Sequence, residues 1–499
     1  MHSETALWHR AGYKLLDAGI GMDFAKWDTR GRKEIRWRRL AVIATAMLLI
    51  PATTFAADEV PTLDLSIHHP ELLAPEFWIS RLPHPQRVTL RPRAVADRNS
   101  ALLRLDPSMH DLHAMPDFLE RRQIEAWLAI SKRPGGTIFD GNGKVVDSAT
   151  LDDIVDNAAI GSIPARQSAR FGLVVHRTAL RTFPTHMRVF NTTDDTDLDR
   201  FQESAAFPGT PVLIAHRSRD GAWLFVVSPD YAAWVDASAI AQGSREKVMS
   251  YMGNRPARLV SGAAAHTTVT PDAPALSELQ LDMGVRLPLA QLTEGSIVNG
   301  QQSGASWAVQ LPVRNVDGSL AFQPALIARS ADTSSAALPL TRANTIRQAF
   351  KFLGERYGWG DDGGTRDCSG FVSAVFASMG VMLPRNTGDQ SRSPVFSRLH
   401  FSGNDATQRH AAIASLQAGD LVYMPGHVML VVGRIGAEPY VIHDIHDGKT
   451  LDADRLRSWH LNGVVVTPLT PLMLDSTHRF VDVATDIVDV LDPGKAGAQ

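Results

Sequence analysis

The spacing of hydrophobic and polar positions changes along the chain and divides it into regions. Between residues 170 and 245, short apolar runs such as "TPVLIAHRS" and "WLFVVSP" alternate with turn residues, which predicts the strands of a small barrel. Residues 258–335 repeat this pattern more weakly, and "SWAVQLPVRNVDGSLAF" is their clearest hairpin. The pattern therefore predicts two small β-barrels in succession.

Apolar residues at helical spacing occur before and after these barrels. The stretch "MPDFLERRQIEAWLAIS" predicts a helix within a mostly helical segment, residues 57–168. Its expected apolar face is Phe118, Leu119, Ile124, Trp127 and Leu128. A second helix is expected after Pro339, with Thr341 at its start. Its expected apolar face is Ile346, Ala349, Phe350 and Leu353.

The region 340–475 mixes one helix with several strands. A helix is expected directly after Cys368, and a polar loop follows it. Three apolar runs then predict strands: "GDLVYMPGHVMLVVGRI", "PYVIHDIHD" and "NGVVVTPL". We interpret this region as an α+β domain whose antiparallel strands pack on the helix. The tail, residues 476–499, ends in Pro, Gly and Ala, and we expect it to be loosely held.

The N-terminus has the pattern of an export signal. Five basic residues precede an apolar run, Leu40–Ile50, and small residues follow Pro51 up to a cleavage position after Ala56. Residues 1–56 are thus predicted to be a signal peptide with an upstream extension, and Met22 is a candidate start. The apolar run is short for a bilayer, which disfavours the alternative of a transmembrane anchor. We expect no stable membrane insertion after cleavage.

Composition and charge narrow the class of protein. The 499-residue chain has a formal charge of −3, and cleavage after Ala56 would leave −7, with 41 basic and 48 acidic residues. This balance provides no basic surface of the kind that nucleic-acid binding requires. We expect an exported protein, periplasmic or secreted, with no nucleic-acid partner. Its one cysteine cannot form an internal disulfide, although disulfides are common in exported proteins.

That cysteine, Cys368, lies where a loop is predicted to become a helix. Unpaired amides at a helix N-terminus favour the thiolate, which is the nucleophilic form of cysteine. A thiolate also needs an imidazole to exchange its proton, and His427 opens an apolar strand after Gly426. His443 lies in the next apolar run and would be the third group that orients His427. The alternative is a buried structural cysteine with structural histidines.

Other histidine clusters suggest metal ligands less strongly. The stretches "HDLH" and "HDIHD", the second of which holds His443 and His446, have no convincing full ligand set. We therefore expect no metal and no cofactor.

Several motifs in order resemble one known family. "RYGWG", "DCSGF", "LPRNTGDQS", "AGDLVYMPGHVMLVVG" and "YVIHD" together resemble the NlpC/p60 cysteine peptidases over residues 345–450. More loosely, residues 60–335 resemble the N-terminal stabilising segment and two bacterial SH3-like domains of one branch. The resemblance implies SH3-like domains at 169–246 and 258–335, followed by an α+β papain-like peptidase domain at 340–475.

The resemblance also implies an activity and a set of site residues. The branch hydrolyses the bond between γ-D-glutamate and a diamino acid in peptidoglycan stem peptides, so these peptides or muropeptides would be the partners. Cys368 would be the nucleophile, His427 the base, and His443 the residue that orients His427. The implied substrate-binding residues are Tyr357, Asp367, Ser369, Thr387 and Tyr231.

The chain departs from the family pattern at two places. The inserted "RIGAEP" lengthens the stretch between the two histidines, so His446 competes with His443 for the third role. "GWGDDGG" adds Asp361 and Asp362 near the cleft, either as determinants of substrate preference or as a solvated loop. Two other functions remain open: an amidase that cuts between the lactyl group and L-alanine, and a catalytically silent wall-binding protein.

Overall fold

The computed structural model describes residues 63, 69–403, 405–452 and 455–492. The chain divides into two units, Met1–Glu59 and Val60–Gln499, and all the described residues belong to the second. The predicted signal peptide and extension, residues 1–56, lie outside the described residues. A search of the described residues finds no helix with the length and apolar character needed to cross a membrane.

The segment before the first sheet contains helices and short strands. Its α-helices are α1 (Pro75–Ile79), α2 (Pro92–Leu105), α3 (Arg121–Leu128) and α4 (Ser148–Asn157). The helix predicted from "MPDFLERRQIEAWLAIS" is wrong at its start, because Phe118–Glu120 form a strand, β1, that pairs with β3 (Arg166–Ser168). Along this strand Leu119 is buried and Phe118 is exposed, so pairing with a distant segment has overridden the local helical periodicity.

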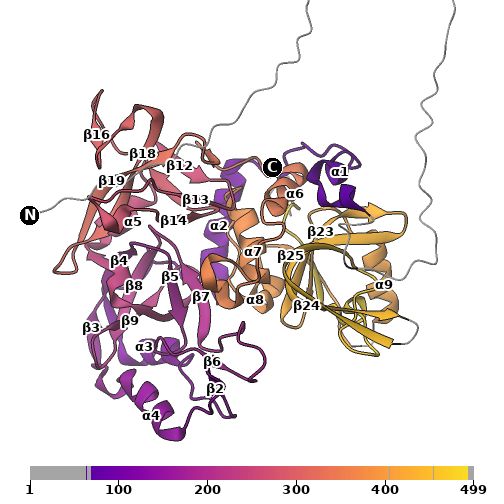
Figure 1. The fold of residues 1–499 in the computed structure, drawn as a ribbon, viewed down its shortest axis with the longest axis horizontal. Helices are drawn as coiled ribbons and strands as arrows, with labels where there is room; N and C mark the ends of the chain where they lie inside the picture. The colour runs from indigo at the N-terminus through magenta and orange to yellow at the C-terminus, as the bar shows by residue number, and fades with distance from the viewer. Residues whose placement is uncertain (1–62, 64–68, 404, 453–454, 493–499) are drawn as a thin grey trace, which may run out of the picture. The chain divides into compact units, whose positions relative to one another are not determined.

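The first strand-rich region forms one seven-stranded antiparallel sheet, in the order β11-β4-β8-β9-β10-β5-β7 (Figure 1). The strands are β4 (Arg170–Val174), β5 (Thr178–Arg181), β7 (Gln202–Ala206), β8 (Pro211–Arg217), β9 (Trp223–Val227), β10 (Ala232–Asp236) and β11 (Ile240–Gly243). Every residue of β9 is buried, so this central strand contributes side chains to the cores on both faces of the sheet. We refer to residues 166–243 as the first β-region.

The second strand-rich region consists of several smaller sheets. Its strands are β12 (Ala257–Val260), β13 (Ala264–His266), β14 (Gln280–Asp282), β15 (Arg286–Pro288), β16 (Ile297–Val298), β17 (Gln301–Gln302), β18 (Ser306–Arg314), β19 (Leu320–Ala328) and β20 (Thr333–Ser334). The hairpin predicted from "SWAVQLPVRNVDGSLAF" is present as the antiparallel pair β18–β19. A core of buried aliphatic residues, including Leu281, Val309 and Ile327, lies among these strands.

The C-terminal region combines a six-stranded sheet with helices. The sheet order is β21-β26-β22-β23-β24-β25. The strands are β21 (Ser397–His400), β22 (Leu421–Met424), β23 (His427–Ile435), β24 (Glu438–Asp452), β25 (Arg455–Pro468) and β26 (Asp486–Asp489). The helices include α6 (Arg342–Phe350), α7 (Cys368–Ala377), α8 (Thr387–Arg392), α9 (Ala406–Ser415) and α10 (Phe480–Val483). Helix α7 shares a core with α6, β22 and β23, which fixes its N-terminus beside the opening of β23.

The expected helix after Thr341 is present but shorter than its apolar face suggested. The Thr341 side chain accepts a hydrogen bond from the Asn344 amide and so caps α6, which ends at Phe350. Leu353 therefore lies beyond the helix, although it still packs against the core. The helix predicted after Cys368 begins at that residue, as expected.

The expectation of a loosely held tail is wrong for its described part. Strand β26 lies inside the C-terminal sheet, paired on one side with β21 and on the other with β22. Val488, Val490 and Leu491 are all buried in the core that also contains α7. The composition of the last residues had hidden this apolar strand, and β21 likewise arises from the stretch predicted to be a polar loop.

We predict that a chain ending at Asp475 will not fold cooperatively. It loses β26, and each buried aliphatic side chain in that strand is worth about 1.5–3 kcal/mol against a typical total stability of about 5–15 kcal/mol. Thermal unfolding followed by circular dichroism is the measurement, with a chain ending at Asp492 as the matched control. An unchanged unfolding midpoint for the shorter chain would contradict the assignment of β26 to the core.

Candidate active site

The cysteine lies at the first position of α7, with its helix cap in place. The side chain of Asp367 accepts a 2.8 Å hydrogen bond from the Gly370 amide and thereby caps the N-terminus of the helix. Cys368 itself is only 5% exposed. A helix N-terminus favours negative charge on a residue at this position.

The thiol also contacts the strand that carries His427. Its Sγ lies 3.9 Å from the carbonyl oxygen of Gly426, and the amide of Val428 donates a hydrogen bond to the thiol. These two residues flank His427, so the thiol lies against the opening of β23, the strand that begins with His427. Burial raises the pKa of the Cys368 thiol, and the charge of Asp367 raises it further, so the resting thiol is neutral.

The two predicted histidines lie in direct contact. Nε2 of His427 is 2.9 Å from Nδ1 of His443, and Nε2 of His443 is 3.0 Å from Oγ1 of Thr467. Two assignments of protons satisfy both bonds, because the Thr467 hydroxyl can donate or accept; in the one that suits a general base, His443 donates to Thr467 and accepts from His427. That assignment leaves Nδ1 of His427 as a free acceptor. Burial lowers the pKa of His427 to about 4, so its imidazole is neutral at rest.

His446, the competitor for the third position, does not contact His427 in this way. Its Nδ1 is 2.7 Å from Asp447 Oδ2, and its Nε2 faces Asp195 and Asp197 at 3.9 and 3.6 Å. The geometry therefore places His443 beside His427 and leaves His446 in a different cluster.

Tyr357 forms a β-bridge with Arg366, two residues before Cys368. Its amide donates a 3.1 Å hydrogen bond to the Asn462 carbonyl, which ties it to β25. Burial raises the pKa of the Tyr357 hydroxyl, and the charge of Asp367 adds to the effect. The phenol is therefore a neutral donor.

An arginine that sequence reasoning missed organises the other side of the site. Both terminal nitrogens of Arg385 donate to Asp367, at 2.7 and 3.1 Å, and Nη1 also donates to Ser369 Oγ at 2.8 Å. The same guanidinium lies 3.2 Å from Asp361 Oδ2, and its Nε donates to Ser204 Oγ at 2.7 Å. Asp367 and Ser369, predicted to contact substrate, are therefore buried and already paired within the protein.

The alternative that Asp361 belongs to a solvated loop is wrong. Asp361 is 3% exposed, and its Oδ1 accepts from the Asp367 amide at 3.1 Å. Burial raises the pKa of Asp361 to about 6, although Arg385 opposes the effect. Asp362, by contrast, is partly exposed and lies 3.3 Å from Arg188. Only the first of the two added aspartates is part of the buried network.

The Asp361 carboxylate occupies the space beside Gly370. A Cβ at Gly370 would lie 2.0 Å from Asp361 Oδ1 and would clash with it, so only glycine fits here. The buried carboxylate explains why the helix begins Cys-Ser-Gly.

The first β-region contributes Tyr231 to the same neighbourhood. Its hydroxyl donates a 2.6 Å hydrogen bond to Glu203 Oε2. Burial raises the pKa of the Tyr231 hydroxyl, and the charge of Glu203 raises it further. Arg385 and Asn386 lower the same pKa. Tyr231 therefore faces the segment that leads into α8, where Thr387 is the first helical residue and is half-buried.

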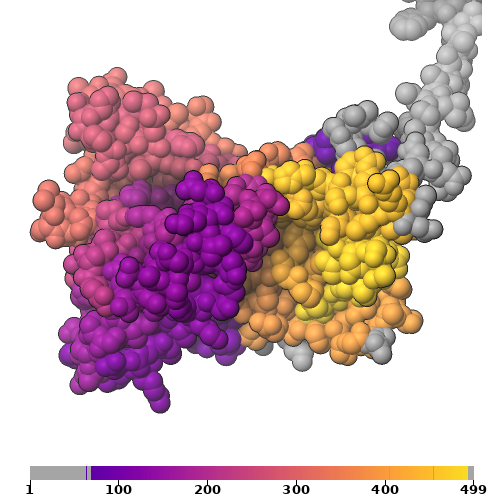
Figure 2. Space-filling model, turned by 60° about the horizontal axis from the view of Figure 1, so that its bottom comes forward, coloured from indigo at the N-terminus to yellow at the C-terminus, as the bar shows by residue number. Residues whose placement is uncertain are grey.

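The first β-region and the C-terminal region are held together by polar contacts. Arg177 donates to the carbonyl oxygens of Asp361 and Thr365 at 2.7 and 2.8 Å, and Gln202 donates to the Gly360 carbonyl at 2.9 Å. Figure 2 shows the magenta part of the first β-region against the orange and yellow C-terminal region. Residues from both regions therefore surround the buried network behind Cys368.

A further buried carboxyl group lies next to His443 in sequence. Neither side-chain oxygen of Asp444 has a hydrogen-bond partner among the described residues. Burial raises the pKa of Asp444 to about 9, and the charges of Asp367 and Glu355 contribute. Asp444 is therefore protonated at neutral pH. The sequence offered no signal for it beyond its place in an apolar run.

Comparison with known families identifies two segments of the chain. Residues 354–464 match the NlpC/P60 family, and residues 188–236 match the SH3 domain (SH3b1 type). These matches confirm the predicted fold class, SH3-like together with a papain-like α+β domain. The second SH3-like domain, residues 258–335, and the other domain boundaries stay predictions.

Curated relatives match over part of their length. "Probable endopeptidase p60" of Listeria seeligeri is 37% identical over 95 residues, which are 18% of this chain and 16% of that protein. "Peptidoglycan endopeptidase RipB" of Mycobacterium tuberculosis is 34% identical over 136 residues, 22% of this chain and 50% of that protein. The chain thus spans half or less of the length of these relatives.

One solved structure is similar over most of the chain. An NlpC/P60 endopeptidase from Photobacterium damselae subsp. piscicida superposes with a TM-score of 0.67, at 15% identity. The match covers 83% of this chain and 97% of the other. At this identity the likeness supports the fold.

We predict that Arg385→Met will destabilise the protein by about 3–5 kcal/mol, because it leaves two buried carboxylates without their cation. The matched control is Arg392→Met, which removes an exposed arginine 3.4 Å from Asp389 and should cost less than about 0.5 kcal/mol. Urea unfolding measures both. Equal stability of the two variants would show that Arg385 does not hold the network together.

We also predict a pH dependence that originates in Asp444. Its folded pKa is raised above the unfolded value, so the folded state binds the proton more tightly and stability falls as pH rises between the two. Relative to Asp444→Asn, the wild type should lose about 1.4 kcal/mol of unfolding free energy per pH unit between about pH 5 and 8. Parallel pH profiles of the two proteins would contradict the assignment.

Proposed function

This chain carries an NlpC/P60 domain together with an SH3 domain, and we propose that it is an exported cysteine endopeptidase that hydrolyses the γ-D-glutamyl–diamino acid bond of peptidoglycan stem peptides. The observation that carries the proposal is the series of contacts from Thr467 through His443 to His427, beside a thiol at a helix N-terminus. A structural cysteine would not need this arrangement. The export signal predicted at residues 1–56 and the relative described as a peptidoglycan endopeptidase support the compartment and the substrate.

In the proposed reaction the resting pair is neutral. Nδ1 of His427 takes the proton of the Cys368 thiol as the sulfur attacks the γ-carbonyl of D-glutamate. The backbone amide of Cys368 would donate to the oxyanion, and the neutral Tyr357 hydroxyl would assist it. His427 then gives its proton to the departing amine, which breaks the peptide bond and leaves a thioester.

Water completes the cycle. It loses a proton to His427 and adds to the thioester, and the thiol leaves with that proton, so enzyme and acid product are restored. His443 keeps Nε2 of His427 engaged throughout and thereby keeps Nδ1 directed to the reacting atoms. Asp367 stabilises the transient imidazolium, since its charge raises the pKa of His427.

The SH3 domain supports a preference for short peptides with a free amino end. Tyr231 and the carboxylate of Glu203 to which it donates come from this region and face the segment at Arg385. Together they would close one end of the cleft and place negative charge there, the sign that a terminal ammonium requires. Asp367, Ser369 and Thr387 would line this end, and the pairing of Asp367 with Arg385 suggests that it positions the site rather than binding substrate through its own side chain.

We predict that the purified mature protein will release L-Ala-γ-D-Glu from L-Ala-γ-D-Glu-meso-diaminopimelate, as detected by mass spectrometry. Cys368→Ala should release none, because no other described side chain at the helix N-terminus can form the thioester. Release of free muramoyl chains from intact peptidoglycan would instead favour the amidase. Normal binding to cell walls by both proteins, with turnover by neither, would favour the silent wall-binding protein.

A second pair of variants tests the role of His443 in the same assay. His443→Ala should lower kcat by about 10²-fold or more, since general-base catalysis contributes about 10²–10⁴-fold and requires an oriented imidazole. His410→Ala is the matched control, because it removes an exposed histidine that pairs with Asp482 at 3.2 Å. Equal kcat for both variants would exclude His443 as the orienting group.

A further inference from the structure

Two histidines on neighbouring strands share one carboxylate. Nδ1 of His446 is 2.7 Å from Asp447 Oδ2, and Nδ1 of His460 is 3.0 Å from Asp447 Oδ1. The two rings are nearly perpendicular, with centroids 5.2 Å apart. A carboxylate that accepts from Nδ1–H fixes the tautomer of each imidazole and leaves its Nε2 as a lone-pair donor. Asp447 therefore prepares two nitrogen ligands at once.

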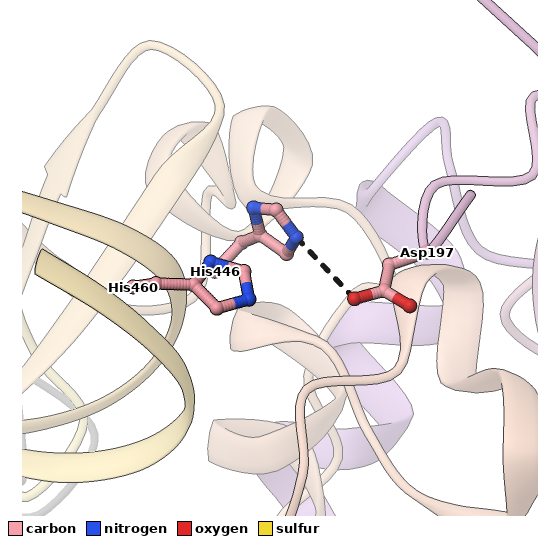
Figure 3. Close-up of side chains that lie close together, drawn as sticks. All are labelled: Asp197, His446 and His460. Atoms are coloured by element: carbon pink, nitrogen blue, oxygen red, sulfur yellow. Dashed lines mark ion pairs between the residues drawn. The ribbon is translucent and has the colours of Figure 1, made fainter. Parts of the chain in front are cut away.

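A third ligand comes from the first β-region, which holds the SH3 match at residues 188–236 and is therefore also called the SH3-containing region. Asp197 lies before β7 and brings its Oδ2 to 3.6 Å from Nε2 of His446 (Figure 3). One ligand atom each from Asp197, His446 and His460 lie within 4.8 Å of one another. Tetrahedral zinc with bonds of about 2.0–2.1 Å needs ligand atoms roughly 3.4 Å apart. Small side-chain movements would bring the three atoms to that spacing.

A bulge in the sheet creates this arrangement. The register between β24 and β25 shifts between Ile445 and Asp447, opposite Asn462, which has a left-handed φ of 43°. The irregularity re-aims the side chains near His446, as bulges commonly do beside functional sites. The side chain of Asn462 then donates to Asp197 Oδ2 at 2.8 Å.

Asp197 keeps capacity for one more partner. It accepts two bonds from Arg356, at 2.9 and 2.8 Å, in addition to the one from Asn462. A carboxylate offers about four lone-pair positions. Oδ2 accepts from both Arg356 and Asn462 and Oδ1 from Arg356 alone, so the remaining position is on Oδ1. These donors fix the carboxylate in place, as outer-shell groups do for metal ligands.

The simpler interpretation is an ion pair between protonated His446 and Asp197. A distance of 3.6 Å is too long for a hydrogen bond. Nε2 of His446 is moreover buried and has no hydrogen-bond partner among the described residues. A buried nitrogen directed at a carboxylate across this gap is better explained by a shared ligand between them.

We propose that Asp197, His446 and His460 form a binding site for a divalent transition metal of the zinc type, which links the SH3-containing region to the peptidase sheet. Two imidazoles with one carboxylate suit zinc and its neighbours and disfavour calcium and magnesium, which prefer oxygen ligands alone. Asp195, 3.9 Å from Nε2 of His446, or a water molecule would take the fourth position.

The site borders the proposed catalytic centre without being part of it. The ring of His446 contacts Tyr357 edge-on, with centroids 6.0 Å apart. The carbonyl of Asn462, the residue that donates to Asp197, accepts from the Tyr357 amide. Metal binding would therefore hold the residues that support Tyr357. The expectation of no metal followed from the lack of a full ligand set around "HDIHD", and Asp197 is distant from that stretch along the chain.

We predict that the full chain carrying Cys368→Ala, stripped with a chelator, will bind one equivalent of Zn²⁺ in calorimetric titration. Cys368→Ala removes the catalytic thiol as a competing ligand. Co²⁺ should produce visible d–d bands without a thiolate charge-transfer band. Adding His460→Ala, a change at an exposed residue, should weaken Zn²⁺ binding at least about tenfold. The matched control is His478→Ala, because His478 is exposed and pairs with Asp475 in a similar way.

Asp447→Asn provides a second test, because this residue does not touch the metal. Loss of its oriented acceptor should weaken binding by about 10–100-fold, with an unchanged circular dichroism spectrum. Equal Zn²⁺ affinity for His460→Ala and His478→Ala would overturn the site. Binding by the wild type but not by Cys368→Ala would also overturn it, since the metal would then be at the catalytic thiol. None of these measurements depends on peptidase activity.

Discussion

The buried guanidinium of Arg385 is the interaction on which the site depends. It neutralises Asp367, which caps the helix that begins at Cys368, and it contacts Asp361, whose carboxylate fills the space beside Gly370. Its Nε reaches Ser204 in the SH3-containing region. One cation thus fixes the start of the helix, the preceding loop and the packing of a second region. Without it, two carboxylates would remain in a place that water does not reach, a condition that proteins avoid.

The same burial sets the resting state of the proposed catalytic pair, Cys368 and His427. A helix N-terminus favours the thiolate, but the buried surroundings and the charge of Asp367 outweigh it, and the pKa of Cys368 is raised. The same burial lowers the pKa of His427, because it disfavours the charged imidazolium. Both effects disfavour charge separation, so the ion pair would form only as substrate supplies an electrophile and the site closes around it. A neutral resting thiol is also less open to oxidation, which would suit the proposed export of a protein with a single cysteine.

The elements and site residues that could be predicted from the sequence are those whose pattern lies within a short stretch of the chain. The helix at Cys368 and the strand at His427 follow from short-range periodicity and turn residues, and the structure has both. Strand β26 was missed because the residues after it are rich in Gly and Ala, although Val488 and its neighbours are apolar enough to enter the sheet. Arg385 carries no local mark, since its partners Asp361 and Ser204 are brought to it only by the tertiary fold.

The cluster around Asp447 is likewise assembled by the tertiary fold from residues far apart in the sequence. Asp197 is already held by Arg356 and Asn462, so the contact between the two regions exists without any metal. A metal would therefore not create the interface; it would select one orientation of groups that already meet. Because Asn462 also binds the amide of Tyr357, that orientation would extend to a residue of the proposed site. The constraint at Arg385 and the cluster at Asp197 join the same two regions at separate points, and two separated attachments restrict rotation in a way that a single one cannot.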